Sequence, residues 1–147
     1  MYTNLLVATD GSKLSEKAVA HAIGLAKKLG ARVTAFYAAP NYPEPAYSDG
    51  IIYNTMSREE YAAMVAREAK KILGKVGNKA ASAGVTCEIR HTLSSAPWEA
   101  ILAAARKYKC DAIVMGSHGR GGLAALLLGS ETQKVLTHSK LPVIIAR

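Results

Sequence analysis

The stretch NLLVATDGSKLSEKAVAHAIGLAKKLGARVTAFYAA, residues Asn4 to Ala39, decides the fold. Its first part, NLLVATD, is a short apolar run typical of a strand that is covered on both faces. Ser12 is a candidate helix cap, and Gly30 is a candidate helix stop. Between them, apolar side chains recur at helical spacing at Leu14, Ala18, Ala22, Leu25 and Leu29. Because a second strand follows at Ala31–Ala39, the stretch predicts a right-handed βαβ unit with two parallel strands.

The same alternation of strands and helices continues to the end of the chain. Ser57–Glu60, SREE, is a capping box that opens a basic amphipathic helix running to about Ala83. The elements expected after it are a strand at Gly84–Leu93, a helix that starts at Ser95 with Pro97 in its first turn, a strand at Cys110–Gly116, a short helix from Ser130 to about His138 and a strand at Leu141–Arg147. We therefore expect one α/β domain over residues 1–147, with a doubly wound, Rossmann-like five-stranded parallel sheet of order 3-2-1-4-5 and helices on both faces.

One long segment interrupts this pattern. Pro40–Met56, PNYPEPAYSDGIIYNTM, contains three prolines and three tyrosines. The prolines exclude regular structure over most of its length. Long loops in compact domains are often lids or binding loops, so we expect such a role here.

The composition is that of an ordinary globular protein. Half of the 147 residues are apolar and a fifth are charged. The two cysteines, Cys87 and Cys110, show no metal-ligand spacing and are expected to be free thiols in a reducing compartment. We find no signal peptide and no apolar run near the roughly 20 residues needed to cross a bilayer. These observations predict a cytoplasmic protein.

The formal net charge of +8 raises the question of nucleic-acid binding. The densest basic stretch is Arg67, Lys70, Lys71, Lys75 and Lys79. It alternates at helical spacing with apolar residues, which predicts an amphipathic helix with its basic side chains on a solvated face. No aromatic interleaving or helix-turn-helix accompanies it, so nucleic-acid binding remains the weaker alternative.

Two polar, glycine-bearing strand ends are expected to meet at the ligand-binding crevice. In the order 3-2-1-4-5 the winding reverses between the first and fourth strands, and ligands bind beyond the carboxyl ends there. The first strand ends in ATDGS and the fourth in MGSHGRGG. This convergence predicts a binding site between them.

Three phosphate-binding motifs compete for the stretch Met115–Gln133, MGSHGRGGLAALLLGSETQ. A Walker A loop fails because Gly122 and Leu123 stand where lysine and serine or threonine are required. The dinucleotide pattern in GRGGLA lacks the βαβ unit and the acidic ribose ligand that should follow.

The third possibility uses two separated pieces of this stretch. Gly116 and Gly119 permit a tight turn, and Gly129 allows close backbone approach. Ser130 would cap the next helix with Gln133 in a capping box, at a helix start suited to phosphate. A glycine-rich turn followed by an ordinary helix cap remains the alternative.

The spacing Gly116-x2-Gly119-x9-Gly129-Ser130 resembles the ATP-binding signature of the universal stress protein family. The first βαβ stretch, CDAIVMGSHGRGG and SKLPVIIAR also resemble that family. The resemblance implies ATP, with Mg²⁺ or Mn²⁺ shared among phosphate oxygens. It assigns Ala8, Thr9, Asp10 and Ala38 to the base and adenosine, Met115 and Gly116 to the ribose and α-phosphate, His118, Gly119 and Arg120 to the turn around the phosphates, and Gly129, Ser130 and Glu131 to the distal phosphates.

A second role is open for three of these residues. Arg120 could clamp a phosphate or be a solvated loop arginine. Asp10 could be a turn or helix-capping residue beside Gly11. His118 is a loop residue or a nucleotide contact, since no second histidine or cysteine lies near it in sequence to form a metal site.

No catalytic motif accompanies the phosphate-binding pattern. We therefore expect a regulatory, stress-response switch in which nucleotide occupancy changes the loops Pro40–Met56 and Gly119–Leu128 and thus the surface for a protein partner. A slow ATPase or phosphotransfer enzyme is the alternative.

The last strand is an expected interface. Pro142–Arg147, PVIIAR, is apolar and would lie bare at the edge of the sheet. The family resemblance likewise implies a homodimer joined through this strand.

Overall fold

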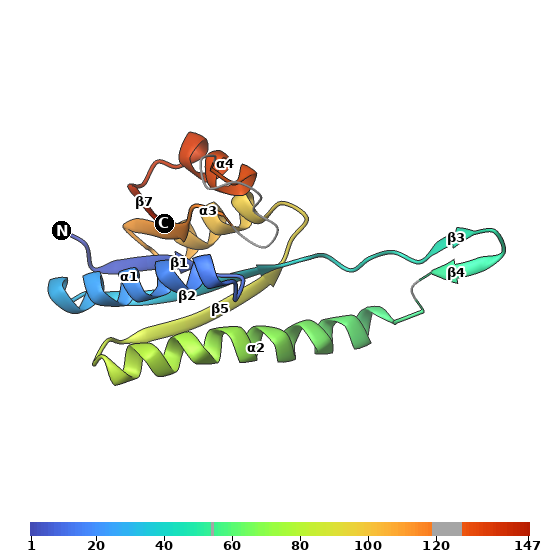
Figure 1. Cartoon of the computed structure of the whole chain (residues 1–147), viewed down its shortest axis with the longest axis horizontal. Coiled ribbons are helices and arrows are strands. Elements are labelled where there is room, and N and C mark those ends of the chain that lie inside the picture. The colour runs from blue at the N-terminus through green and yellow to red at the C-terminus, as the bar shows by residue number, and fades with distance from the viewer. Residues whose placement is uncertain (54, 119–127) are drawn as a thin grey trace.

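A computed structural model of the chain describes residues 1–53, 55–118 and 128–147. Its elements are β1 (Asn4–Ala8), α1 (Lys13–Leu29), β2 (Arg32–Ala39), β3 (Ala46–Ser48), β4 (Ile51–Tyr53), α2 (Arg58–Ser82), β5 (Cys87–Leu93), α3 (Pro97–Lys107), β6 (Ala112–Gly116), α4 (Ser130–His138) and β7 (Val143–Ala146). The main sheet has five parallel strands in the order β5-β2-β1-β6-β7 (Figure 1). This is the expected order 3-2-1-4-5, so the predicted fold class is confirmed.

Helices cover both faces of this sheet. In β1, Leu5 and Val7 pack with α1 and α2, whereas Leu6 between them packs with α3 and α4. All three side chains are fully buried. Since neighbouring side chains of a strand point to opposite faces, burial on both faces explains the unbroken apolar run in β1.

Local capping signals in the sequence set the bounds of α1 and α2. The Ser12 hydroxyl accepts a hydrogen bond from the Ser15 amide at 3.2 Å, and Gly30 ends α1 in the left-handed conformation. The Ser57–Glu60 capping box forms in both directions, with distances of 2.7 and 3.1 Å. These hydrogen bonds hold the pKa of the Glu60 carboxyl below its ordinary value.

The start of α3 differs from the expectation. Its N-cap is Ala96, not Ser95, and no side chain in residues 1–53, 55–118 and 128–147 caps it. The Ser94 hydroxyl instead accepts from the Ala96 amide at 3.0 Å, which forms a turn just before the helix. Pro97 is the first helical residue, where its missing N–H costs no intrahelical bond.

Helix α2 is long and amphipathic, as predicted. Its buried positions are Tyr61, Val65, Ala69, Leu73, Val76 and Ala80. Within the described ranges, no helix combines the length and apolar character needed to span a membrane.

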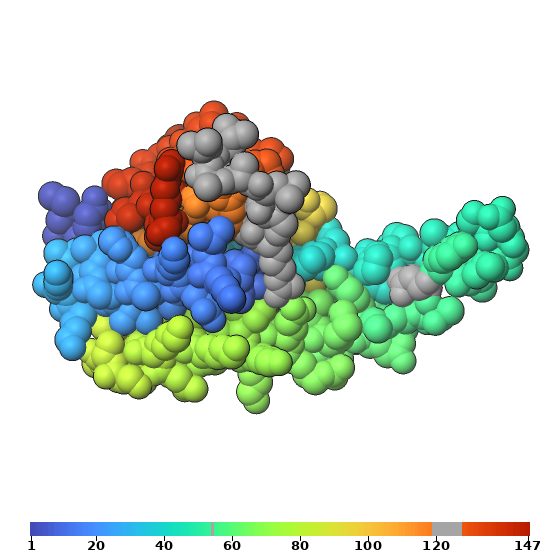
Figure 2. All heavy atoms as spheres, in the orientation of Figure 1, coloured from blue at the N-terminus to red at the C-terminus, as the bar shows by residue number. Residues whose placement is uncertain are grey.

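The predicted loop Pro40–Met56 contains a β-hairpin that the sequence did not predict. Strands β3 and β4 pair antiparallel and project from the body of the molecule (Figures 1 and 2). Asp49 and Gly50 connect them with positive φ angles of 50° and 75°, which is the signature of a tight Asp-Gly hairpin turn. All six strand residues are exposed.

Both cysteines are free, as expected. Cys110 is buried and Cys87 is half-buried. Burial raises the pKa of both thiols, which keeps them protonated and poorly nucleophilic.

A polar network closes the amino end of the sheet. Asn4, only 1% exposed, donates to the Tyr108 carbonyl at 3.0 Å and accepts from the Thr34 hydroxyl at 3.0 Å. The Asp111 carboxylate accepts from the amide and hydroxyl of Thr3 at 2.7 and 2.8 Å. Burial raises the pKa of Asp111, but the hydrogen bonds from Thr3 and Asn4 outweigh it and leave the pKa below its ordinary value.

Asp111→Asn is expected to lower the free energy of unfolding at pH 7 by about 1 kcal/mol, because the charge-assisted bonds from Thr3 are weakened. A depressed carboxyl pKa stabilises the fold above the unfolded value of about 3.9 and loses that effect as pH falls through the folded value. Urea denaturation should therefore show a difference between wild type and variant at pH 7 that shrinks near pH 3. Asp49→Asn, in the exposed hairpin turn, is the matched control; an equal effect there would contradict the assignment.

Candidate functional site

A cavity of about 470 Å³ opens beyond the carboxyl ends of β1 and β6. Ten of the residues expected at the site line it: Ala8, Thr9, Asp10, Ala38, Met115, Gly116, His118, Gly129, Ser130 and Glu131. The other two, Gly119 and Arg120, lie outside the described residues. The cavity thus brings together every described residue expected at the site.

One part of the cavity is apolar. Ala8, Ala38 and Met115 from three strands are joined there by Phe36 and Ile101. The sequence patterns did not assign the last two to the site. Phe36 lies two residues before Ala38 on β2 and so shares its face, which is a signal that alternation could have supplied.

The end of β1 is a tightly bonded turn. The Thr9 amide donates to the Phe36 carbonyl at 3.0 Å, and the Thr9 and Ser15 hydroxyls lie 2.9 Å apart. The Asp10 carboxylate accepts from the Ser12 amide at 2.9 Å, so the turn role considered for Asp10 is present. Gly11 has a φ of 80°, which favours glycine at this position. Asp10 thus organises the start of α1 and also lines the cavity.

Gly116 and Gly129 are sites of close backbone packing. A Cβ atom at Gly116 would lie 3.2 Å from the carbonyl oxygens of both Leu14 and His118. One at Gly129 would lie 3.3 Å from the Ser117 carbonyl oxygen, to which the Gly129 amide donates at 2.7 Å. The backbone itself therefore joins the β6 end to the start of α4.

The start of α4 differs from the prediction in its cap. Gly129 is the N-cap, and its carbonyl accepts from the Gln133 amide at 2.9 Å. Ser130 is the first helical residue, so the expected Ser130–Gln133 capping box does not form. No side chain of the described part of the chain caps α4. Because the first N–H groups of a helix lack intrahelical acceptors and carry the positive end of its dipole, this start is suited to an anion.

Glu131 links α4 to α3 at the rim of the cavity. Its carboxylate accepts from the Trp98 amide at 2.9 Å and lies 3.5 Å from the Lys134 ammonium. Trp98 is in the first turn of α3, so a negative charge is favourable there. On the β6 side, His118 Nδ1 lies 3.2 Å from the Ser117 hydroxyl.

The described lining carries two carboxylates, Asp10 and Glu131, and no lysine or arginine. Residues 1–53, 55–118 and 128–147 contain no group of three histidine, cysteine or acidic side chains that could hold a metal ion. A divalent cation here would therefore need oxygen ligands from a bound molecule as well as from the protein.

The model of the universal stress protein family matches residues 1–147. A universal stress protein of Methanocaldococcus jannaschii is 33% identical over 152 residues, covering 100% of this chain and 83% of that protein. Another from Thermus aquaticus is 36% identical over 151 residues, covering 100% of both.

Solved structures of universal stress proteins share the fold. One from Lactobacillus plantarum has a TM-score of 0.80 at 24% identity, covering 99% of this chain and 98% of that one. One in complex with cAMP has a TM-score of 0.68 at 28% identity, covering 99% and 97%. One from Archaeoglobus fulgidus in complex with dAMP has a TM-score of 0.70 at 21% identity, covering 99% and 98%.

Gly116→Ala is expected to lower the free energy of unfolding by about 1–3 kcal/mol, because the new methyl group meets backbone atoms that cannot rotate away. Gly24→Ala is the matched control, since Gly24 is exposed on α1 and has no neighbouring atom within 4 Å of the position that a Cβ would take. That control should be stabilised by up to about 1 kcal/mol. Chemical denaturation of both variants measures the difference, and equal stability would show that Gly116 is not closely packed.

Proposed function

The chain belongs to the universal stress protein family, and we propose that it is a stress-response protein that binds ATP as a regulatory switch. The observation that carries this proposal is the cavity beyond β1 and β6. It combines an apolar part with the start of α4, which no side chain of the described residues caps, within one space of about 470 Å³. That volume lies within the range of roughly 300–1,000 Å³ usual for small-molecule sites.

The residues present fit the two halves of a nucleotide. Ala8, Ala38 and Met115 provide the apolar contacts expected for a purine, and Phe36 and Ile101 extend them. At the other end, the N–H groups at the start of α4 and the Ser130 hydroxyl would bind phosphate oxygens. The solved relatives in complex with cAMP and dAMP support the adenosine half of this assignment.

A divalent cation fits the charge of this site. Mg²⁺ or Mn²⁺ would neutralise part of the phosphate charge that the two carboxylates otherwise repel. Asp10 and Glu131 are the described side chains that could contribute oxygen ligands beside the phosphates.

Regulation, not catalysis, is the favoured role. A ligand that contacts both the β6 end and the start of α4 would favour the conformation in which these two pieces are correctly spaced. Phosphoryl transfer would require a group that positions the nucleophile and a cation that stabilises the transferred phosphoryl. No observation on the described residues favours that alternative.

Two variants test the apolar end of the cavity and the α4 end independently. Ala38→Met should weaken both ATP and AMP at least tenfold, since the half-buried Ala38 lines the apolar part and the longer side chain would occupy the space proposed for the base. Ser130→Asp introduces a carboxylate at the start of α4 and should weaken ATP about tenfold while changing AMP much less. Isothermal titration calorimetry with Mg²⁺ present measures both.

Each matched control introduces the same new side chain, methionine or aspartate, at an exposed position outside the cavity lining. Ala62→Met lies on the exposed face of α2, and Thr137→Asp lies at an exposed position in the last turn of α4. Both should bind nucleotide like wild type. Loss of affinity in the controls, or wild-type affinity in Ala38→Met, would contradict the proposed site. Sustained ATP turnover by the pure protein that is lost on changing Asp10 or Glu131 would favour the slow-enzyme alternative.

We also propose a homodimer joined through β7. The carbonyls of Pro142 and Ala146 accept hydrogen bonds from the amides of Ile113 in β6 and of Ser117, the residue after β6. Because alternate residues of a parallel strand bond to the same neighbour, the backbone groups of Val143 and Ile145 face the open edge. The side chains of this edge are apolar and only half-buried, which favours pairing with a second β7.

Ile145→Pro should convert the dimer to a monomer in sedimentation velocity, because it removes an N–H group from the open edge and leaves the β6–β7 bonds intact. His91→Pro is the matched control on β5, the opposite edge of the sheet. There, Thr86 and Ser94 bond to β2, so the same alternation places His91 outward. A wild-type protein that is monomeric at micromolar concentration, or a dimer lost equally in His91→Pro, would contradict pairing through β7.

A further inference from the structure

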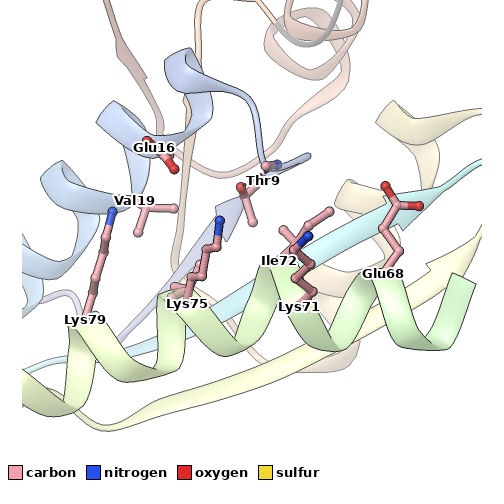
Figure 3. A pocket seen from close by; sticks show the side chains of 10 residues that line it. Thr9, Glu16, Val19, Glu68, Lys71, Ile72, Lys75 and Lys79 are labelled. Atoms are coloured by element: carbon pink, nitrogen blue, oxygen red, sulfur yellow. Dashed lines mark hydrogen bonds between the residues drawn. The ribbon is translucent and has the colours of Figure 1, made fainter.

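A second cavity, of about 250 Å³, lies between α1 and α2 (Figure 3). Three lysines of α2 line it, Lys71, Lys75 and Lys79, with Thr9 and Glu16 from the β1–α1 region. We call this cavity the lysine groove. Figure 3 shows Lys75 and Lys79 rising from α2 towards α1.

Lys71, Lys75 and Lys79 are exposed, as the sequence predicts for the basic face of α2. The structure adds that these three lysines also border a cavity shared with α1. Ile72, Val76 and Val19 line the same cavity and give it an apolar component. Only the position of α1 in the folded molecule creates this concave, basic surface.

The three lysines form a line of positive charge along α2. Successive members are four residues apart, which places them on one face of α2 about 6 Å apart along its axis. Like charges at this spacing destabilise a helix. Although Glu16 and Glu68 line the same cavity, none of the three ammonium groups forms an ion pair with the described residues.

The start of α1 adds to the positive potential. Gly11 lines the groove directly before the Ser12 cap, where the helix dipole is positive. The volume is below the range of roughly 300–1,000 Å³ usual for drug-sized ligands, so a small ligand fits better than a whole nucleotide. A duplex nucleic acid would need a broader basic surface than this concave space.

We propose that the lysine groove binds a small anion that carries two or more phosphate groups, at a site distinct from the nucleotide cavity. The line of ammonium groups provides a charged contact for each of several phosphates. Thr9 lines both cavities. The anion is therefore either a free inorganic polyphosphate or a polyphosphate extension of the nucleotide, and both present the same chemistry to the lysines.

The charge of Glu16 should affect anion binding in the direction opposite to that of the lysine charges. Its carboxylate lines the groove opposite the lysines and repels any bound anion. Removing this charge should strengthen anion binding, whereas removing a lysine charge should weaken it. A role that is only structural would not produce these opposite effects.

The test is titration calorimetry with inorganic tripolyphosphate at low salt, in the Ser130→Asp background so that the start of α4 does not bind the probe. Lys75→Gln should weaken binding at least threefold, and Glu16→Gln should tighten it about twofold, as expected for single charges at an exposed site. Lys70→Gln is the matched control, because Lys70 lies on α2 with the same charge but does not line the groove. Amide NMR shifts should move at Val19 and Val76.

Several results would overturn the proposal: no measurable binding, equal weakening in Lys70→Gln and Lys75→Gln, or binding of duplex DNA much tighter than of tripolyphosphate. The ATP affinity of Lys75→Gln, measured without the Ser130 change, identifies the source of the phosphates. Unchanged affinity indicates a free anion, and weakened affinity indicates a nucleotide extension. Because the tripolyphosphate titration uses the Ser130→Asp background, its result tests the lysine groove whether or not the other cavity binds a nucleotide.

Discussion

The structure depends on the complete burial of β1 between two layers of helices. Leu5, Leu6 and Val7 are each 0% exposed, so the middle of this strand can hold no polar side chain. Its polar groups are confined to its two ends. At the amino end, Asn4 is fully bonded to neighbouring strands and loops. At the carboxyl end, Thr9 and Asp10 emerge beside β6, because parallel strands bring their carboxyl ends to the same edge.

Much of this arrangement could be predicted because its signals are local. The capping box at Ser57–Glu60 and the stop at Gly30 act within one turn of the chain, and the structure contains both. The rules of winding left few orders for five alternating strands, and the family resemblance supported the order 3-2-1-4-5 among them. The ten described site residues were placed by strand ends and by the family signature, and all of them line one cavity.

The features that the sequence did not predict depend on tertiary contacts or, for the β3–β4 hairpin, on a two-residue turn motif beside prolines that indicate an irregular loop. The N-cap of α4 is Gly129 because its amide bonds to Ser117, a contact that the Ser-x-x-Gln pattern does not encode. The hairpin turn at Asp49–Gly50 was obscured by the prolines before it. Lys71, Lys75 and Lys79 face a groove only because α1 lies opposite, and helical periodicity alone cannot place a second helix.

The glycines of the signature also have a purely structural reason to be there. Gly116 and Gly129 are needed wherever the β6 end packs directly against α1 and α4, whether or not a ligand is bound. The glycine pattern therefore indicates this packing first. The case for nucleotide depends on what the packing creates, which is an α4 start without a side-chain cap from the described residues, in the same cavity as an apolar surface.

The two cavities would bind phosphate by different physical means. The described lining of the nucleotide cavity contains no lysine or arginine, so binding there relies on N–H groups held in position by the backbone. The lysine groove presents ammonium groups at exposed positions. Salt screens exposed charges strongly but affects fixed, partly buried hydrogen bonds much less. Ionic strength therefore distinguishes the two cavities, because anion binding in the lysine groove should weaken steeply as salt rises. The fixed N–H groups at the α4 start should instead keep their selectivity for the position of each phosphate oxygen. Since Thr9 borders both cavities, any coupling between their ligands must be reciprocal.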